Sequence, residues 1–219
     1  MPILDIAFDV LMGSDLQSPD LVATAYAAAV IGLIVSISGG IVAASANDRN
    51  LGIFFDIHIR RRLDPVYWLS ICAAPVVLGL ATAFIALVLV YLASGQAMKP
   101  DELALAILGA LGMGLFLGIA ASGVGMGLPD PYLGATIVGV FLPVSAGVIV
   151  PLSLAPDWMR KVAGAIPGGR TVQAIHDGAI TVGAIGVDLL IGFVWAVGGI
   201  VFVRVAVGRI RRGLKVSVL

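Results

Sequence analysis

The sequence predicts an all-α membrane protein, a polytopic bundle of about five transmembrane helices. Sixty per cent of the 219 residues are apolar, 12 per cent are charged and the mean hydropathy is +1.10. Soluble domains have about a quarter of their residues charged, so a water-soluble fold could not hide this much apolar surface. The apolar residues also fall in long runs, and roughly 20 residues are what a helix needs to cross a hydrocarbon core about 30 Å thick. A membrane β-barrel would instead show alternating segments of about ten residues.

Five such runs make up one transmembrane domain over residues 1–219. They lie at about residues 21–44, 67–93, 103–122, 132–154 and 184–207. Each run is almost free of charge. The exceptions, Asp188 and Arg204, fall near the two ends of the last run, where we expect their side chains to reach the lipid headgroups.

The basic residues predict the orientation in the membrane, because cytoplasmic loops carry an excess of Lys and Arg. Nine of the 13 fall between the first two runs or from the end of the last run onward: Arg49, Arg60, Arg61, Arg62, Arg204, Arg209, Arg211, Arg212 and Lys215. The other four are Lys99, Arg160, Lys161 and Arg170. The N-terminus is therefore predicted to lie outside and the C-terminus in the cytoplasm.

The loop at residues 47–65 mixes bulky apolar and cationic side chains. As a helix it would place Leu51, Phe55, Ile59 and Leu63 along one strip that could dock in a groove of a partner protein. Its arginines could then bind carboxylates of the partner or lipid phosphates. The alternative is a topology anchor that lies on the bilayer surface. Composition alone leaves the two interpretations about even.

The second unusual segment covers residues 146–167. Pro151 and Pro156 should break a helix near the outer surface, and Trp158 with its neighbouring cations should then begin another short helical piece. The chain is expected to bend back there rather than leave the membrane. Taken alone, the residues favour an ordinary belt of Trp, Lys and Arg at the headgroups.

Gly114 and Gly118 form a GxxxG pair in the third run, and such pairs let two helices approach closely. The pattern is frequent in glycine-rich spans, so packing within the chain is favoured over a dimer contact.

Several classes of function receive no support from the residues. The formal net charge is zero, so no overall basic field would attract nucleic acid. His58 and His176 fall on opposite sides of the predicted membrane and cannot share a metal or a proton relay. The sequence has no glycine-rich phosphate-binding loop with a lysine, so this chain would not hydrolyse ATP by itself. We therefore expect neither an enzyme nor a bound cofactor, and a pump would need a separate ATPase.

Taken in order, these motifs resemble the membrane subunit of ATP-binding-cassette transporters of the type-2 permease family, over nearly the whole chain. In that family a charged cytoplasmic loop with an arginine and a glycine precedes a proline and the next span; Arg49, Gly52 and Pro65 occupy comparable places. Later the family shows a small-glycine-apolar-proline run, a proline-x-tryptophan with basic residues, and a further proline. The matching residues are Gly147, Pro151, Pro156, Trp158, Arg160 and Pro167.

The resemblance implies a transmembrane subunit of an exporter in the bacterial plasma membrane. It implies that the loop, with Arg49, Gly52, Phe54, Phe55, Ile59, Arg60, Arg61 and Arg62, contacts a cytosolic ATPase subunit that binds the ATP. It implies that Gly147, Pro151, Pro156, Trp158 and Pro167 belong to a re-entrant outer gate, and that a second permease subunit completes a homodimer or heterodimer. Members usually have six spans, whereas five are predicted here. The alternative, from another class, is a non-transporting structural or assembly protein whose basic loop binds lipid or a scaffold.

Overall fold

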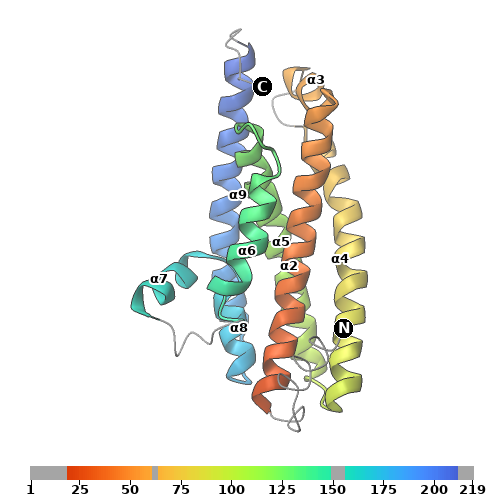
Figure 1. Ribbon diagram of the computed structural model, residues 1–219, viewed down its shortest axis with the longest axis vertical. Helices are drawn as coiled ribbons and strands as arrows, with labels where there is room; N and C mark the ends of the chain where they lie inside the picture. Colours follow the sequence, from red (N-terminus) through yellow and green to blue (C-terminus); the bar gives the residue numbers. More distant parts are fainter. Residues whose placement is uncertain (1–18, 61–63, 149–155, 212–219) are drawn as a thin grey trace, which may run out of the picture.

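A computed structural model describes residues 19–60, 64–148 and 156–211 as an assembly of α-helices with no strands in these ranges, which confirms the predicted fold class (Figure 1). The helices are α2 (Pro19–Asn50), α3 (Ile53–Arg60), α4 (Pro65–Ser94), α5 (Pro100–Met126), α6 (Leu133–Ser145), α7 (Asp157–Ala165), α8 (Gly169–His176) and α9 (Val182–Arg211). Figure 1 shows the long helices α2, α4, α5 and α9 side by side, with α3 at one end and α8 at the other. These ends are called the α3 end and the α8 end below.

Four of these helices are long and apolar enough to cross a membrane: Leu21–Asn50, Pro65–Ser94, Pro100–Met126 and Val182–Gly208. They coincide with the first, second, third and fifth predicted runs and are longer than predicted. The largest extension is at α2, which continues to Asn50 and takes in the first residues of the predicted 47–65 loop.

The helix at the fourth predicted run, residues 132–154, is shorter than expected. α6 ends at Ser145 after 13 residues, which is about 20 Å at 1.5 Å per residue and less than the core of a bilayer. Gly147 adopts φ +84°, a left-handed conformation that ends the helix and that a glycine adopts without strain. Residues 149–155, with Pro151, lie outside the described part of the chain.

Local sequence signals set the boundaries of α4. The Asp64 carboxylate accepts a hydrogen bond from the backbone N–H of Val66 at 3.0 Å, and Pro65 occupies the first helical position. At the other end Gly95 adopts φ +67° and its N–H bonds to the Tyr91 carbonyl. These N- and C-terminal caps satisfy backbone groups that the helix itself leaves without partners.

α2 forms the centre of the bundle, with α4, α5, α6 and α8 packed around it. Its Ile34, Ile37 and Ile41 are completely buried. A Cβ placed on Gly114 would lie 3.0 Å from the Ile37 Cβ, and one on Gly118 would lie 2.7 Å from Ile41 Cδ1. The GxxxG pair of α5 therefore packs against α2 within the chain, as predicted.

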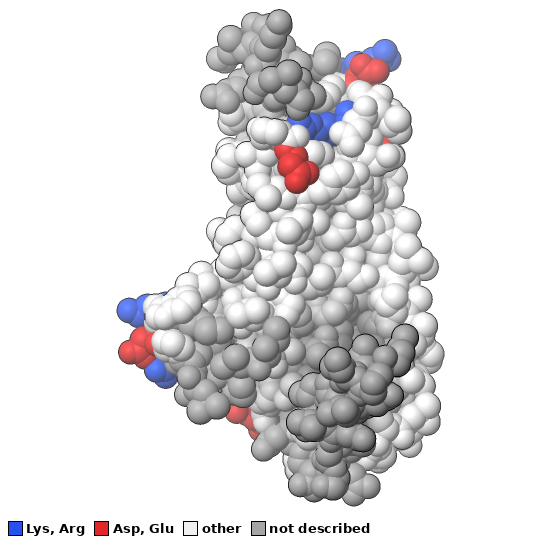
Figure 2. Space-filling view, in the orientation of Figure 1, with Lys and Arg blue, Asp and Glu red and all other residues white. Residues whose placement is uncertain are grey.

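The outer faces of the bundle are apolar. α4 buries one narrow stripe at every fourth residue, from Tyr67 to Ala83, while Leu69 and Phe84 on its other faces remain about 70 per cent exposed (73% and 69%). In Figure 2, charged atoms gather at the α3 end and over α7, with a smaller acidic spot toward the α8 end, and the described surface between the two ends is largely uncharged. This distribution is expected of a helical bundle that is solvated by lipid along its length.

Candidate functional site

Arg49, the first of the residues predicted to contact the ATPase, is held inside the protein. Its side chain sits at the end of α2 and is only 6% exposed. One guanidinium nitrogen, Nη1, donates to the carbonyl oxygens of Gly125 at 2.8 Å and Leu128 at 2.7 Å. These are carbonyls at the C-terminal end of α5, where orphan acceptors and the helix dipole favour a cation. The prediction that Arg49 binds carboxylates of a partner is wrong for this residue, because its side chain is buried and its Nη1 is bonded to the turn between α5 and α6.

Gly52 separates α2 from α3 and adopts φ +80°. Its N–H bonds to the Arg49 carbonyl, and its own carbonyl accepts from Asp56 at 3.2 Å. The left-handed conformation reverses the chain within two residues, which is why a glycine is needed here. As a result Leu51 lies in the turn, outside α3, and does not belong to the predicted helical strip.

The inner face of α3 packs on the start of α4 through five aromatic rings, named here the aromatic cluster: Phe54, Phe55, His58, Tyr67 and Trp68. Phe54 and His58 are completely buried. Their rings stack with centroids 4.1 Å apart, and Tyr67 meets the His58 ring edge to face at 5.0 Å. Aromatic pairs of this kind contribute roughly 0.5–1.5 kcal/mol beyond burial. The cluster makes α3 a fixed part of the bundle end.

His58 is buried as a neutral side chain. Its Nδ1 lies 2.8 Å from the Phe54 carbonyl oxygen, so Nδ1–H is the donor, and its Nε2 has no hydrogen-bond partner in the described part of the chain. Burial lowers the pKa of the imidazole below its usual value, against smaller opposing effects of the Phe54 carbonyl and the Asp64 carboxylate. Protonation of Nε2 would create a second buried N–H donor, and this donor would have no hydrogen-bond acceptor in the described residues.

The outer face of α3 and the turn that precedes it are the parts available to a partner. Leu51 and Ile53 are 64% and 43% exposed, and Asp56 and Arg60 are also exposed. Phe54, which was predicted to lie in the contact surface, faces inward instead, because its ring fills the space above Tyr67. Phe55 is half-buried in the aromatic cluster. Arg61 and Arg62 fall outside the described residues, and Ile59 is described only in its backbone.

The predicted outer segment folds back onto the bundle at the α8 end. Pro156 is the N-cap of α7, Trp158 is 67% exposed, and Pro167 is buried in the turn that leads to α8. α8 lies against α2 and α9, burying Thr171, Val172 and Ile175. His176 at its end is within 3.2 Å of the Thr24 hydroxyl of α2, so it lies at the opposite end of the bundle from His58.

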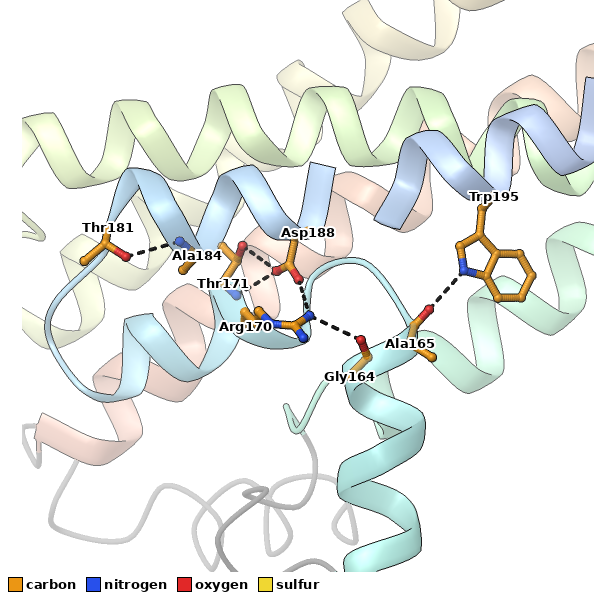
Figure 3. A network of polar contacts seen from close by, with 8 residues as sticks. All are labelled: Gly164, Ala165, Arg170, Thr171, Thr181, Ala184, Asp188 and Trp195. Carbon is orange, nitrogen blue, oxygen red and sulfur yellow. Dashed lines mark hydrogen bonds and ion pairs between the residues drawn. The ribbon is translucent and has the colours of Figure 1, made fainter. Parts of the chain in front are cut away.

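A buried carboxylate fastens this segment to α9 (Figure 3). Asp188 is 0% exposed, and its Oδ2 accepts hydrogen bonds from the Thr171 N–H and the Thr171 hydroxyl, both at 2.9 Å. Its Oδ1 lies 3.6 Å from Nη1 of Arg170, which also donates to the Gly164 carbonyl at 3.2 Å. The expectation that Asp188 reaches the headgroups is wrong, because α8 covers it.

Trp195 adds a second link between α9 and the outer segment. Its ring Nε1–H donates to the Ala165 carbonyl at the end of α7, at 3.0 Å. Neither link was predicted. The available signal was the one acidic residue of the last span, 18 positions after an arginine, and such residues usually face a partner inside the bundle.

Comparison with known proteins identifies no relative: no family model, no curated protein and no solved structure matches this chain. In the described residues no three His, Cys, Asp or Glu side chains are grouped so that they could hold a metal ion. The arrangement therefore consists of a helical membrane bundle with a fixed short helix at one end and a folded-back segment at the other.

Proposed function

We propose that this chain is the transmembrane subunit of an ATP-driven exporter, coupled to a separate cytosolic ATPase through the exposed face of α3. The observation that supports this best is the way α3 is tied to the bundle. A short helix with a buried aromatic face and an exposed apolar and charged face is suited to bind a partner and to transmit its movement.

Two connections would carry such a movement from α3. The aromatic cluster joins α3 to α4, so a push on α3 displaces the start of that span. Arg49 joins the adjacent end of α2 to the turn between α5 and α6. α2 is one continuous helix whose far end contacts α8 at Thr24 and His176. A displacement at the α3 end would therefore be transmitted along α2 to the outer segment.

The remaining parts of the proposal follow from the predicted orientation and the family resemblance. The α3 end would face the cytoplasm of a bacterium, and the α7–α8 segment would lie toward the outside of the plasma membrane. A second permease subunit would complete the path for the cargo. Apolar helices without exposed interior charge suit a lipidic or amphipathic cargo better than a small ion.

The experiment is co-purification in detergent with a soluble ATPase that has a phosphate-binding loop and is encoded beside this chain. The test variant is Leu51→Glu with Ile53→Glu, because both side chains are exposed, Leu51 in the turn before α3 and Ile53 as the first residue of α3. The matched control is Leu21→Glu with Val182→Glu, which makes the same change at exposed apolar residues of the α8 end. Phe54 is unsuitable for this test because it is buried.

We expect the native chain and the control to retain the ATPase and to change its rate of ATP hydrolysis, and the α3 variant to lose both effects. Arg49→Met should retain the ATPase but lose part of the change in rate, because methionine keeps an unbranched side chain but has no donor for the Gly125 and Leu128 carbonyls. If the native chain retains no such ATPase, the proposal fails, and a structural membrane protein with a lipid- or scaffold-binding loop becomes the better interpretation.

A further inference from the structure

A groove with a volume of about 480 Å³ opens on the side of the bundle between α5, α6 and α9. One end of it is formed by Ile166 and Pro167, which follow α7. All the side chains that line it are apolar except that of Trp195, whose Nε1–H is already bonded to the Ala165 carbonyl. The interior of the groove therefore has no free polar side chain that could bind a polar ligand.

Small residues form the floor of the groove and aromatic residues form its walls. A Cβ on Gly199 would lie 2.5 Å from the Ala120 Cα, and one on Gly134 would lie 2.5 Å from the Ala121 carbonyl oxygen. The helix backbones are thus in direct contact beneath the groove and cannot close it by moving nearer. Phe141 and Phe202 stand at its edges and are 62% and 58% exposed.

The dimensions and chemistry of the groove limit what can occupy it. Water does not fill a cavity that offers it no polar partners. Along α9 the groove extends from Val194 to Phe202, about 12 Å at 1.5 Å per residue. An extended hydrocarbon chain is narrow enough to lie in it.

Positive charge lies close to the end formed by Ile166. α7 carries Asp157, Arg160 and Lys161, a net charge of +1, and both cations are exposed although Arg160 pairs with Asp157. Lys161 precedes Ile166 by five residues, about 8 Å along a helix. A phosphate group at this end of the groove would therefore lie within reach of the α7 cations.

We propose that the groove binds an acyl chain of an anionic phospholipid, with the phosphate of the headgroup against Arg160 and Lys161 of α7. The chain occupies the apolar space between Phe141 and Phe202 and contacts the Trp195 ring. The proposal does not depend on whether the protein is an exporter.

Trp195 provides a direct probe, because bromine atoms on a lipid chain quench the fluorescence of a tryptophan they touch. The protein carries Trp68→Phe and Trp158→Phe, so that Trp195 is the single emitter, and is placed in phosphatidylcholine vesicles. The added probe is phosphatidylglycerol with brominated chains, compared with equally brominated phosphatidylcholine. The groove is blocked with Gly198→Leu, because a Cβ on Gly198 meets no atom within 4 Å.

The matched control is Gly186→Leu, which makes the same change on the same helix outside the groove and also meets no atom within 4 Å. We expect brominated phosphatidylglycerol to quench Trp195 at lower mole fractions than phosphatidylcholine, and Lys161→Gln to weaken its apparent affinity about five-fold. Gly198→Leu should abolish most of the quenching and Gly186→Leu should not.

Equal quenching of the Gly198→Leu and native proteins would overturn the proposal, because contact would then come from lipid outside the groove. Equal quenching by both lipids would overturn the role of the α7 cations. Absence of quenching by either lipid would overturn the whole proposal. Cross-linking between copies would then test whether a second chain covers the groove.

Discussion

At the scale of single residues, two buried charged side chains are each held by a small number of defined partners. Arg49 donates to carbonyl oxygens at a helix end, and Asp188 accepts from Thr171 and lies beside Arg170. In an apolar bundle an unpaired charge is costly, so each such group determines the position of the segment that pairs with it. His58 differs, since it is buried in its neutral form and its Nε2 remains without a partner in the described residues.

We expect the stability of the protein to fall below about pH 6.5 because of His58. Its pKa is lowered in the folded state, so the unfolded chain binds the proton more readily and the free energy of unfolding decreases as the pH drops through the unfolded value of about 6.5. Above that pH both states are neutral and the effect is absent. The slope cannot exceed about 1.4 kcal/mol per pH unit for one group.

Thermal denaturation in detergent between pH 7.5 and 5.5 measures this effect. His58→Phe keeps a stacked ring against Phe54 and should remove the part of the slope that comes from this site. An unchanged slope in the variant would assign the pH dependence to other groups.

At the scale of elements, the short helices differ in how they are fixed. α3 is fixed by aromatic packing on α4, whereas α8 is fixed by the polar contacts of Asp188 and by burial against α2. α7 carries exposed charges and is joined to α9 chiefly by the hydrogen bond from Trp195 to Ala165. The elements at the two ends therefore respond to different substitutions.

Asp188→Ala should release α8 without affecting α3. The change leaves the Thr171 N–H and hydroxyl without an acceptor, and hydrogen bonds to charged groups contribute on the order of 2 kcal/mol. Hydrogen–deuterium exchange of the backbone should become faster over residues 169–176 and stay the same over 53–60. The control is Asp177→Ala, which removes an exposed carboxylate at the end of the same helix. Equal exchange in both variants would show that apolar packing alone holds α8.

At the scale of the whole molecule, the bundle depends on close contacts between helix backbones. A Cβ on Gly123 of α5 would lie 2.2 Å from the Gly199 carbonyl oxygen of α9, and this atom belongs to the backbone and cannot rotate away. Without a hydrophobic force between helices in lipid, such close van der Waals packing is a major source of association. The contact thus fixes the distance between the two spans that line the groove.

Gly123→Ala should therefore destabilise the protein markedly, by about 1–3 kcal/mol as is typical of overpacking. Gly32→Ala and Gly39→Ala are the controls, because a Cβ at either position meets no atom within 4 Å and alanine favours a helix. Their midpoints of thermal denaturation should be equal to or higher than that of the native protein. A small loss in Gly123→Ala would show that α5 and α9 can separate without cost.

The predicted orientation is testable on the same scale. In a Cys72→Ser background, single cysteines at Arg60 and Lys161 probe the exposed surfaces of α3 and α7. A maleimide that cannot cross the membrane should label Lys161→Cys in intact cells and Arg60→Cys only after the membrane is opened. The reverse pattern would invert the orientation and place α3 outside, away from any cytosolic ATPase.

Much of the fold was predictable because a bilayer imposes it. Long uncharged runs can satisfy their backbone groups in lipid only as helices, so the class of the fold and four of the five predicted runs follow from composition and length. Local signals such as the Asp64 cap and the turn at Gly52 can also be recognised from residue types in the sequence. The lengths of the helices were less predictable. α6 ends at Ser145, just before Gly147 adopts its left-handed conformation.

Tertiary structure decided which side chains form the candidate sites. The sequence by itself marked the 47–65 loop and the 146–167 segment as unusual, but not which side chains face inward. Arg49 and Phe54 were expected at the surface because they lie in the 47–65 loop, and Asp188 because it lies near the start of the last apolar run. Each is buried because another part of the chain covers it: the turn after α5, the start of α4 and α8. Burial of this kind depends on contacts between distant segments, and no local pattern of residues encodes it.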